Sequence, residues 1–415
     1  MVNIIASHAK GKALKKDALQ ISANAKAAKA LNSKVVDSTL GTFYYEDGSF
    51  KCHKTINNIL SNLDDKEKYA YSTSKGTKEF QEGAINWLFK DYRGIVEEKL
   101  SIAAIPTPGG TGAIVASVLN STNEGETVLI PTPCWGPYVG ICESHGRKVE
   151  KFNLFKDDKF GFENLKEKSE ELIKKQGKLV VMINDPCNNP SGYTMTEEEL
   201  NELISYFNSL QSVPVVLIYD CAYIDMSIDG INGSRKKLSV FKNAEENVMI
   251  LVAMSFSKSF FVYGQRLGAQ VILSKNSEEV EEFFNAGNYQ ARNTWSNCNK
   301  AAITLIEKLD KNPSLIKEVE EEISVVVNLL KERADAFIKE ADECGLKYYP
   351  FSSGFFLSIP CNNSDLVLDK LVEEENIYLI PVAGGVRVAL CSMPVETIKG
   401  VAARIKKVID KYGKI

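Results

Sequence analysis

Short apolar runs alternate with amphipathic segments through the central part of the chain. Most of these runs are bounded by turn-forming residues, which is typical of strands buried on both faces of a sheet. Strands are predicted at residues 127–130, 148–152, 179–183, 213–219, 248–254 and 269–273, and helices at 162–175 and 196–208. This alternation, from about residue 103 to 273, predicts an α/β fold with a mostly parallel sheet between helices.

The two ends of the chain have a different pattern. Residues 1 to about 36 are rich in Ala and Lys and lack a broad apolar stripe, so we expect short helices that lie on another part of the protein. Pro313 begins a long amphipathic segment that reaches about Cys344. In the tail, short strands are predicted at 346–349, 354–359, 378–380 and 386–390, and helices at 365–374 and 394–412.

This change of pattern predicts two domains, since a chain of 415 residues is too long for one small core. Residues 1–47 are expected to form an N-terminal arm and part of the small domain, and residues 48–312 the large domain. Residues 313–415 are expected to form a connector helix and the rest of a smaller α+β domain.

Composition argues against several classes of protein. Apolar residues make up 44% and charged residues 25%, as in ordinary globular proteins. The net charge of −4 gives no reason to expect nucleic acid or an anionic membrane as partner. Nine Cys without CxxC pairing and only three His predict neither a disulfide framework nor a metal site. Without a signal-peptide core or a run of about eighteen apolar residues, the protein is expected to be cytoplasmic.

One stretch, residues 255–269, carries the most specific chemistry. Lys258 follows the buried run at 248–254, and open α/β sheets bind their ligands outside the carboxyl ends of the strands. Ser255, Ser257 and Arg266 flank it and suit a phosphate held beside an amine. Lysine forms Schiff bases once its neighbours lower its pKa. Taken alone, the pattern is more often a solvated lysine on a loop, so the rest of the chain decides.

A glycine-rich turn, Gly109-Gly110-Thr111-Gly112, lies between a predicted strand and a predicted helix. A helix that begins after such a turn points free N–H groups and the positive end of its dipole at an anion. The spacing fits neither GxGxxG nor the Walker pattern, so a nucleotide is not favoured. The turn therefore predicts a phosphate site, with a plain tight turn as the alternative.

Polar and aromatic residues follow three other predicted strands. Trp135 follows 127–130, where it either stacks on a flat cofactor ring or fills the core. Asn189 lies in the polar loop after 179–183, whose side-chain amides are expected to point inward. Asp220 ends the run at 213–219, with Tyr223 three residues later. A carboxylate at such a position is poorly solvated and needs a cationic partner.

Four short motifs together resemble those of one enzyme family. They are Asn189-Pro190-Ser191-Gly192, Asp220-x-x-Tyr223, Ser255-x-Ser257-Lys258 and Arg266-x-Gly268. Their order and spacing are similar to those of the class I/II aminotransferases, the fold-type-I enzymes that use pyridoxal 5′-phosphate. The resemblance extends from about Gly41 to Arg387. It implies a large domain with a mostly parallel seven-stranded sheet.

The resemblance implies roles for the residues around this cofactor. Lys258 matches the lysine that forms the Schiff base and moves a proton between Cα and the cofactor. Asp220 matches the carboxylate that pairs with the pyridine N–H, so that the ring acts as an electron sink. Asn189 and Tyr223 match the hydrogen-bond partners of the phenolic oxygen. Trp135 matches the ring that stacks on the cofactor, and Tyr71 matches the tyrosine contributed by the partner subunit. The residues that match the phosphate-binding group are Gly110, Thr111, Ser255, Ser257 and Arg266.

The resemblance also implies a substrate site that includes Trp135 and Asn189. Arg387 matches the arginine that binds the substrate α-carboxylate through a bidentate contact. Gly41 matches the glycine of the loop over the substrate. Arg292 resembles the arginine of the other subunit that binds a distal carboxylate, with an exposed helix arginine as the alternative.

Three positions depart from the family pattern. Trp295 and Cys298, close to Arg292, stand where relatives of the aspartate and aromatic type have tyrosine and proline. Tyr138 stands where many relatives have a histidine behind the cofactor aspartate.

The function implied is a ping-pong transamination through pyridoxamine phosphate. The expected pair is an L-amino acid of aspartate or aromatic type and a 2-oxo acid such as 2-oxoglutarate, and a homodimer with shared active sites is also implied. A β-lyase of the same fold is the nearest alternative, because the cofactor carries the chemistry. A non-catalytic regulator that binds the same cofactor is a second alternative, against which the intact Lys258, Asp220 and Arg387 argue.

Overall fold

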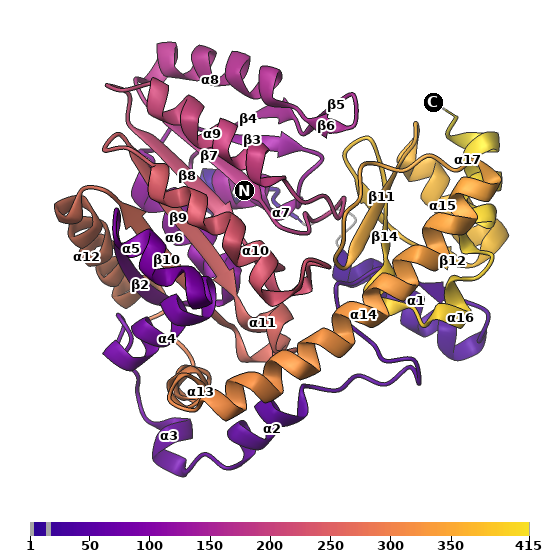
Figure 1. The fold of residues 1–415 in the computed structure, drawn as a ribbon. Coiled ribbons are helices and arrows are strands. Elements are labelled where there is room, and N and C mark those ends of the chain that lie inside the picture. The colour runs from indigo at the N-terminus through magenta and orange to yellow at the C-terminus, as the bar shows by residue number, and fades with distance from the viewer. Residues whose placement is uncertain (1–3, 14–17, 415) are drawn as a thin grey trace.

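A seven-stranded sheet organises the fold. The structure is a computed structural model that describes residues 4–13 and 18–414. The strand order is β2-β10-β9-β8-β7-β3-β4 (Figure 1). β10 is antiparallel to both of its neighbours and the other pairs are parallel, which confirms the mostly parallel sheet. The strands are β2 (Ser101–Pro108), β3 (Thr127–Thr132), β4 (Lys148–Asn153), β7 (Leu179–Asn184), β8 (Val215–Asp220), β9 (Val248–Ser255) and β10 (Leu267–Ser274).

Helices cover both faces of this sheet, so the expected α/β class is confirmed. Side chains of β7 alternate between the faces: Val180 and Met182 enter one apolar core, and Leu179 and Val181 enter the other. The first core also receives side chains from α6 (Gly109–Ser121), α7 (Pro137–Ser144) and α12 (Ser277–Thr294). The second receives them from α2 (Lys54–Ser61), α4 (Lys78–Phe89), α5 (Arg93–Glu97), α8 (Phe162–Gln176), α9 (Glu197–Ser209), α10 (Gly230–Leu238) and α13 (Lys300–Asp310). Shorter elements are α3 (Asp65–Tyr69), β5 (Phe155–Lys156), β6 (Lys159–Phe160) and α11 (Phe256–Ser259).

Capping residues set the starts of three helices. Thr77 caps α4, because its hydroxyl accepts a hydrogen bond from the N–H of Phe80 at 3.1 Å. Thr196 and Glu199 form a reciprocal capping box at the start of α9. Pro313 begins α14 (Pro313–Cys344), where its missing N–H has no cost.

The C-terminal elements surround a separate apolar core. β14 (Gly385–Ala389) lies between β11 (Phe356–Pro360) and β13 (Ile380–Val382), and both pairings are antiparallel. Side chains of α15 (Ser364–Glu375), α16 (Val395–Ile398) and α17 (Val401–Tyr412) complete this core. α14 contributes to this core and to that of the large sheet, and Figure 1 shows it running between the two. The exact boundaries at residues 47 and 312 stay a prediction.

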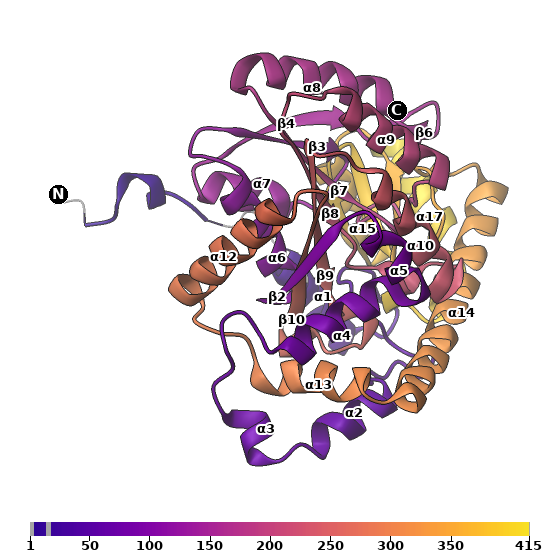
Figure 2. The ribbon, with the colours of Figure 1, turned by 60° about the vertical axis from the view of Figure 1, so that its left-hand side comes forward.

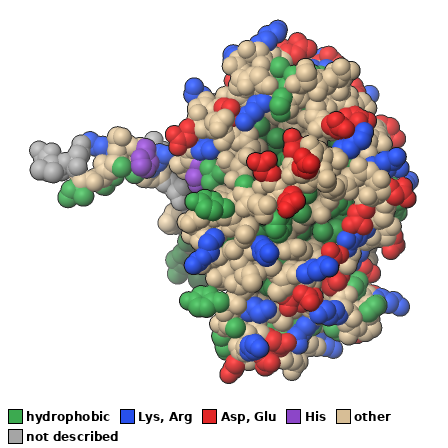
Figure 3. All heavy atoms as spheres, turned by 90° about the vertical axis from the view of Figure 1, so that its left-hand side faces the viewer, with side chains coloured by type: hydrophobic (Ala, Val, Ile, Leu, Met, Phe, Trp, Pro, Cys, Tyr) green, Lys and Arg blue, Asp and Glu red, His purple; other side chains and the backbone are tan. Residues whose placement is uncertain are grey.

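The N-terminal segment returns to the C-terminal elements. β1 (Val36–Asp37), which follows α1 (Ala18–Leu31), pairs in parallel with β12 (Ile377–Tyr378). Residues 4–13 project from the body of the molecule (Figures 2 and 3), and Ile4 and Ile5 are exposed there. Among the residues that the structure describes, no helix has the length and apolar character needed to cross a bilayer.

Two local predictions in the tail are wrong. Residues 346–349 do not form a strand, although the N–H of Tyr349 donates to the carbonyl of Ser358. Pro350 follows and has no N–H, so it cannot extend a ladder from that point. The helix predicted at 394–412 is divided into α16 and α17, because Gly400 adopts a positive φ of 79° between them.

Candidate active site

A pocket of about 440 Å³ lies at the carboxyl ends of the central strands, beside the start of α6. This is the position at which open α/β sheets bind ligands. Most of the residues predicted to bind the cofactor line it. The lining residues are Leu19, Gly110, Thr111, Ile114, Trp135, Asn184, Asn189, Asp220, Ala222, Tyr223, Ser255, Ser257, Lys258, Tyr263 and Arg266.

Lys258 lies in α11, directly after β9. Its ammonium donates to the carbonyl of Gly41 at 3.2 Å and lies 4.5 Å from the centre of the Tyr263 ring. Burial lowers the pKa of Lys258 to about 8, and the nearby guanidinium groups of Arg266 and Arg387 act in the same direction. The amine is therefore partly neutral near physiological pH, as a nucleophile or base requires.

Asp220 ends β8 and is 5% exposed. Its carboxylate accepts hydrogen bonds from the Tyr138 hydroxyl at 2.5 Å and from the N–H of Ala222 at 3.1 Å. Burial raises the pKa of Asp220 to about 6, while these two hydrogen bonds oppose the rise. Both donors are neutral, so the floor of the pocket presents a buried carboxylate that suits a cationic ligand group, such as a protonated pyridine nitrogen.

The opposite end of the pocket presents hydrogen-bond donors. Arg266 donates to the carbonyls of Tyr263 at 3.0 Å and Pro108 at 3.4 Å, and to the hydroxyl of Ser257 at 3.5 Å. Gly109, at φ 73°, lies so close that a Cβ there would come within 2.4 Å of the Arg266 guanidinium. A guanidinium, hydroxyls and the free N–H groups at the start of α6 together fit a phosphate.

Asn189 and Tyr223 line a third side of the pocket, and Arg387, which is not itself a lining residue, contacts Asn189. One Arg387 nitrogen (Nη1) donates to Oδ1 of Asn189 at 2.9 Å, and the other (Nη2) to the carbonyl of Thr39 at 2.6 Å. The Arg387 guanidinium also stacks on the ring of Phe356 at 4.0 Å, and its Nε has no partner among the described groups. Burial raises the pKa of Tyr223, so its phenol stays protonated and is able to donate.

Of the other predicted site residues, Trp135 lines the pocket, whereas Gly41, Tyr71 and Arg292 are not among its lining residues. Trp135 lines it and contacts Tyr138 edge to face at 5.4 Å. Gly41 faces Phe356 so closely that a Cβ would come within 2.6 Å of the ring. Tyr71 is 91% exposed, and Arg292 lies at the end of α12, where it donates to the hydroxyl of Ser296 at 2.5 Å. The structure does not bring Tyr71 and Arg292 to the pocket of their own chain.

Of the five lining residues that were not predicted, two, Asn184 and Tyr263, make polar side-chain contacts. Asn184, at the end of β7, donates from Nδ2 to the carbonyl of Asp220 at 2.8 Å and accepts from the N–H of Asn189 at 2.6 Å. The Tyr263 hydroxyl accepts from the N–H of Phe43 at 3.1 Å. Asn184 could have been predicted from the sequence, because it ends a buried strand. Tyr263 reaches the pocket through a 3₁₀ turn, which leaves no periodic pattern in the sequence.

Comparison with known proteins identifies the family of this chain. The family model described as "Aminotransferase class I and II" matches residues 33–405. The chain belongs to this family. Its fold type and its assignment as an aminotransferase that uses pyridoxal 5′-phosphate, both expected from the sequence, are thereby confirmed.

Individual relatives differ in their stated substrates. Aspartate aminotransferase of Haemophilus influenzae is 24% identical, in an alignment that covers 89% of this chain and 92% of that relative. LL-diaminopimelate aminotransferase 2 of Nostoc is 26% identical over 72% of this chain and 70% of its own. Among solved structures, an aminotransferase of Anaerococcus prevotii is 32% identical, with a TM-score of 0.94 over 99% of this chain and 100% of its own. An aromatic-amino-acid aminotransferase of Burkholderia pseudomallei, covalently bound to pyridoxal phosphate, has the same fold at 19% identity, with a TM-score of 0.80 over 98% and 100%.

Proposed function

We propose that this aminotransferase exchanges the amino group of an aspartate-type or aromatic L-amino acid with a 2-oxo acid such as 2-oxoglutarate. The observation that carries the proposal is the arrangement of Lys258, Asp220 and Arg387. A buried amine and a carboxylate with neutral partners line one cavity, and the Arg387 guanidinium donates to Asn189, which lines the same cavity. The aspartate and aromatic aminotransferases among the relatives support this substrate class.

The residues present fit the cofactor. Asp220 would hold the pyridine N–H, and Asn189 and Tyr223 would donate to the phenolic oxygen. Trp135 would cover the ring, and the phosphate would be held by Gly110, Thr111, Ser255, Ser257 and Arg266. When bound, pyridoxal phosphate supplies an electron sink for the negative charge left at Cα by removal of a proton.

Two side chains of this chain, Arg387 and Lys258, would act on the substrate, and a third, Asp220, on the cofactor. Arg387 binds the α-carboxylate through its two terminal nitrogens, which fixes the orientation of Cα. Lys258, whose pKa burial lowers to about 8, would remove the Cα proton as a general base and then, as a general acid, deliver it to the cofactor carbon. Asp220, in its ionised form, would pair with the protonated ring nitrogen of the cofactor.

A homodimer is part of the proposal. The Ser72 hydroxyl lies 2.7 Å from the Cys298 carbonyl and 3.3 Å from Asn297 Oδ1, so the segments of Tyr71 and Arg292 are neighbours on the surface. In a dimer, the partner subunit's Tyr71 would reach the phosphate and the partner subunit's Arg292 the distal carboxylate. The exposed Ile4 and Ile5 on the projecting segment provide apolar surface for such an interface. We also propose that the protein acts in the cytoplasm.

The absorption spectrum of the cofactor-loaded protein tests the substrate class. Aspartate or glutamate is expected to convert the yellow form to the pyridoxamine form, and 2-oxoglutarate to restore it. Conversion by aromatic or neutral amino acids alone would reject the distal-carboxylate role of Arg292. A yellow form that persists while pyruvate or ammonia is released would instead indicate a β-lyase.

A further inference from the structure

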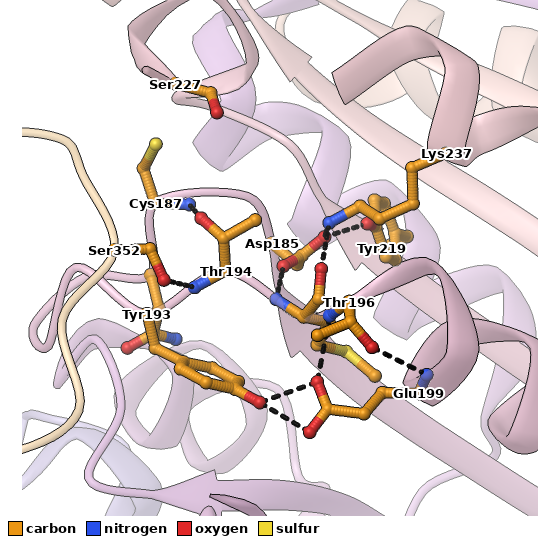
Figure 4. A network of polar contacts seen from close by, with 12 residues as sticks. Asp185, Cys187, Tyr193, Thr194, Thr196, Glu199, Tyr219, Ser227, Lys237 and Ser352 are labelled. Carbon is orange, nitrogen blue, oxygen red and sulfur yellow. Dashed lines mark hydrogen bonds and ion pairs between the residues drawn. The ribbon is translucent and has the colours of Figure 1, made fainter. Parts of the chain in front are cut away.

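A buried ion pair lies behind the pocket, between α10 and the loop that follows β7. Lys237 is 6% exposed and Asp185 is 1% exposed. The Lys237 ammonium donates to Oδ2 of Asp185 and, at 2.9 Å, to the carbonyl of Met195. The Tyr219 hydroxyl donates to the same carboxylate oxygen. Figure 4 shows Lys237 and Tyr219 pointing toward Asp185 from two different elements.

This network closes the loop at its two ends. Asp185 begins the loop, and its other carboxylate oxygen accepts from the N–H of Met195, ten residues later, at 2.6 Å. Lys237 therefore bridges both ends, because it contacts the Asp185 side chain and the Met195 backbone at once. A second link crosses the loop from the N–H of Cys187 to the hydroxyl of Thr194 at 3.0 Å (Figure 4).

The closed loop is connected to the pocket through two amides. Asn184, adjacent to Asp185, accepts from the N–H of Asn189 at 2.6 Å and donates to the backbone of Asp220 at 2.8 Å. Asn189 in turn accepts from Arg387 at 2.9 Å. A movement of the loop ends would therefore displace the Asn189 amide and its contact with Arg387 together.

Stability alone is a weak reason for such an arrangement. Removing an ammonium and a carboxylate from water is costly, and apolar residues of the same size often replace a buried pair without loss. The pair also lies outside the pocket, since neither Lys237 nor Asp185 is among its lining residues. Groups that orient the residues contacting a ligand often affect its binding as strongly as those residues do.

We propose that Lys237 and Asp185 are positioning residues, which hold the loop so that the Asn189 amide faces the phenolic oxygen of the cofactor and the substrate-binding Arg387. The inference rests on the role proposed for Asn189. A donor to the phenolic oxygen favours its anion, so a displaced amide raises the pH at which the cofactor bound to Lys258 changes colour.

The test uses Lys237→Met and the double variant Lys237→Met/Asp185→Asn, which leaves no unpaired carboxylate. The control is Leu172→Ala in α8, a buried leucine on the same side of the sheet that lowers stability without touching the loop. Three quantities are measured for each: the unfolding midpoint, the affinity for pyridoxal phosphate from tryptophan fluorescence, and the pH midpoint of the bound cofactor's absorption.

Both Lys237 variants are expected to raise the absorption midpoint by about 0.5 pH unit or more and to weaken cofactor binding about 10-fold, beyond the control. A midpoint and an affinity equal to those of Leu172→Ala would overturn the proposal and leave the pair a structural role. If the single variant does not fold, the double variant is judged by the same criterion. Failure of the proposed substrate class would appear separately, as a wild-type absorption band that neither aspartate, glutamate nor an aromatic amino acid converts.

Discussion

The Tyr138 hydroxyl offers the most direct test of how the protein controls Asp220. It donates at 2.5 Å to a buried carboxylate whose pKa burial raises to about 6. A hydrogen bond to a charged group contributes about 1.5–3 kcal/mol, and 1.36 kcal/mol corresponds to one pKa unit. Tyr138→Phe removes this bond and little else, so the pKa of Asp220 in the cofactor-free protein should rise by about 1–2 units, to about 7–8.

The assay is the pH dependence of pyridoxamine 5′-phosphate binding, followed by tryptophan fluorescence. Only the ionised carboxylate pairs with the protonated ring nitrogen, so affinity falls about 10-fold per pH unit below the pKa of Asp220. The acidic limb of this profile, the pH range in which affinity falls, should therefore move upward by about 1–2 pH units in Tyr138→Phe. Tyr206→Phe serves as the matched control, because Tyr206 packs against Phe162 and Phe207, away from the pocket. An acidic limb at the same pH in wild type and Tyr138→Phe would refute the reasoning.

Four further predictions follow from the site. Lys258→Ala should lower turnover at least about 10³-fold and remove the absorption of covalently bound cofactor; near-normal steady-state turnover would contradict its role. Arg387→Lys should lower kcat/KM about 10²-fold for every amino acid, because a single ammonium cannot replace the bidentate contact. Arg292→Leu should lower kcat/KM for aspartate but not for phenylalanine, and equal losses would exclude the distal-carboxylate contact. In the cofactor-free protein, the raised pKa of Asp220 means that the folded state holds the proton more tightly, so urea-unfolding stability should fall from pH 4 to pH 6; Asp220→Asn should flatten that slope.

The sheet and its helices could be predicted because burial on both faces leaves continuous apolar runs, as in β7 and β9. Lys258 and Asp220 could be located for the same reason, since each directly follows such a run. The secondary structure of the C-terminal residues was harder to predict. Residues 346–349 are apolar and aromatic enough for a strand, but strand formation depends on a partner, and Pro350 prevents the ladder from continuing there.

Contacts between distant residues could not be predicted from patterns. Tyr263 lies beside Lys258 because the chain makes a 3₁₀ turn, and Lys237 contacts Asp185 across 52 positions of sequence. In sequence, Lys237 is one of several lysines and arginines at the end of an amphipathic helix, where exposure is the usual outcome. Only the packing of α10 against the loop after β7 makes it a buried partner.

The site brings together ionisable side chains whose burial disfavours their charged forms. Burial raises the pKa of Asp220 to about 6 and lowers that of Lys258 to about 8, so each group has lost part of its stabilisation as an ion. Arg387 is buried as well, with Asn189 and the backbone of Thr39 as its hydrogen-bond partners. A bound cofactor would give Asp220 a cationic partner and use the Lys258 amine in a covalent bond, and a substrate carboxylate would neutralise Arg387. A ligand that binds only the folded protein increases the stability of the folded protein. The free energy that these charged groups lose on burial is therefore recovered when a ligand with matching charges binds.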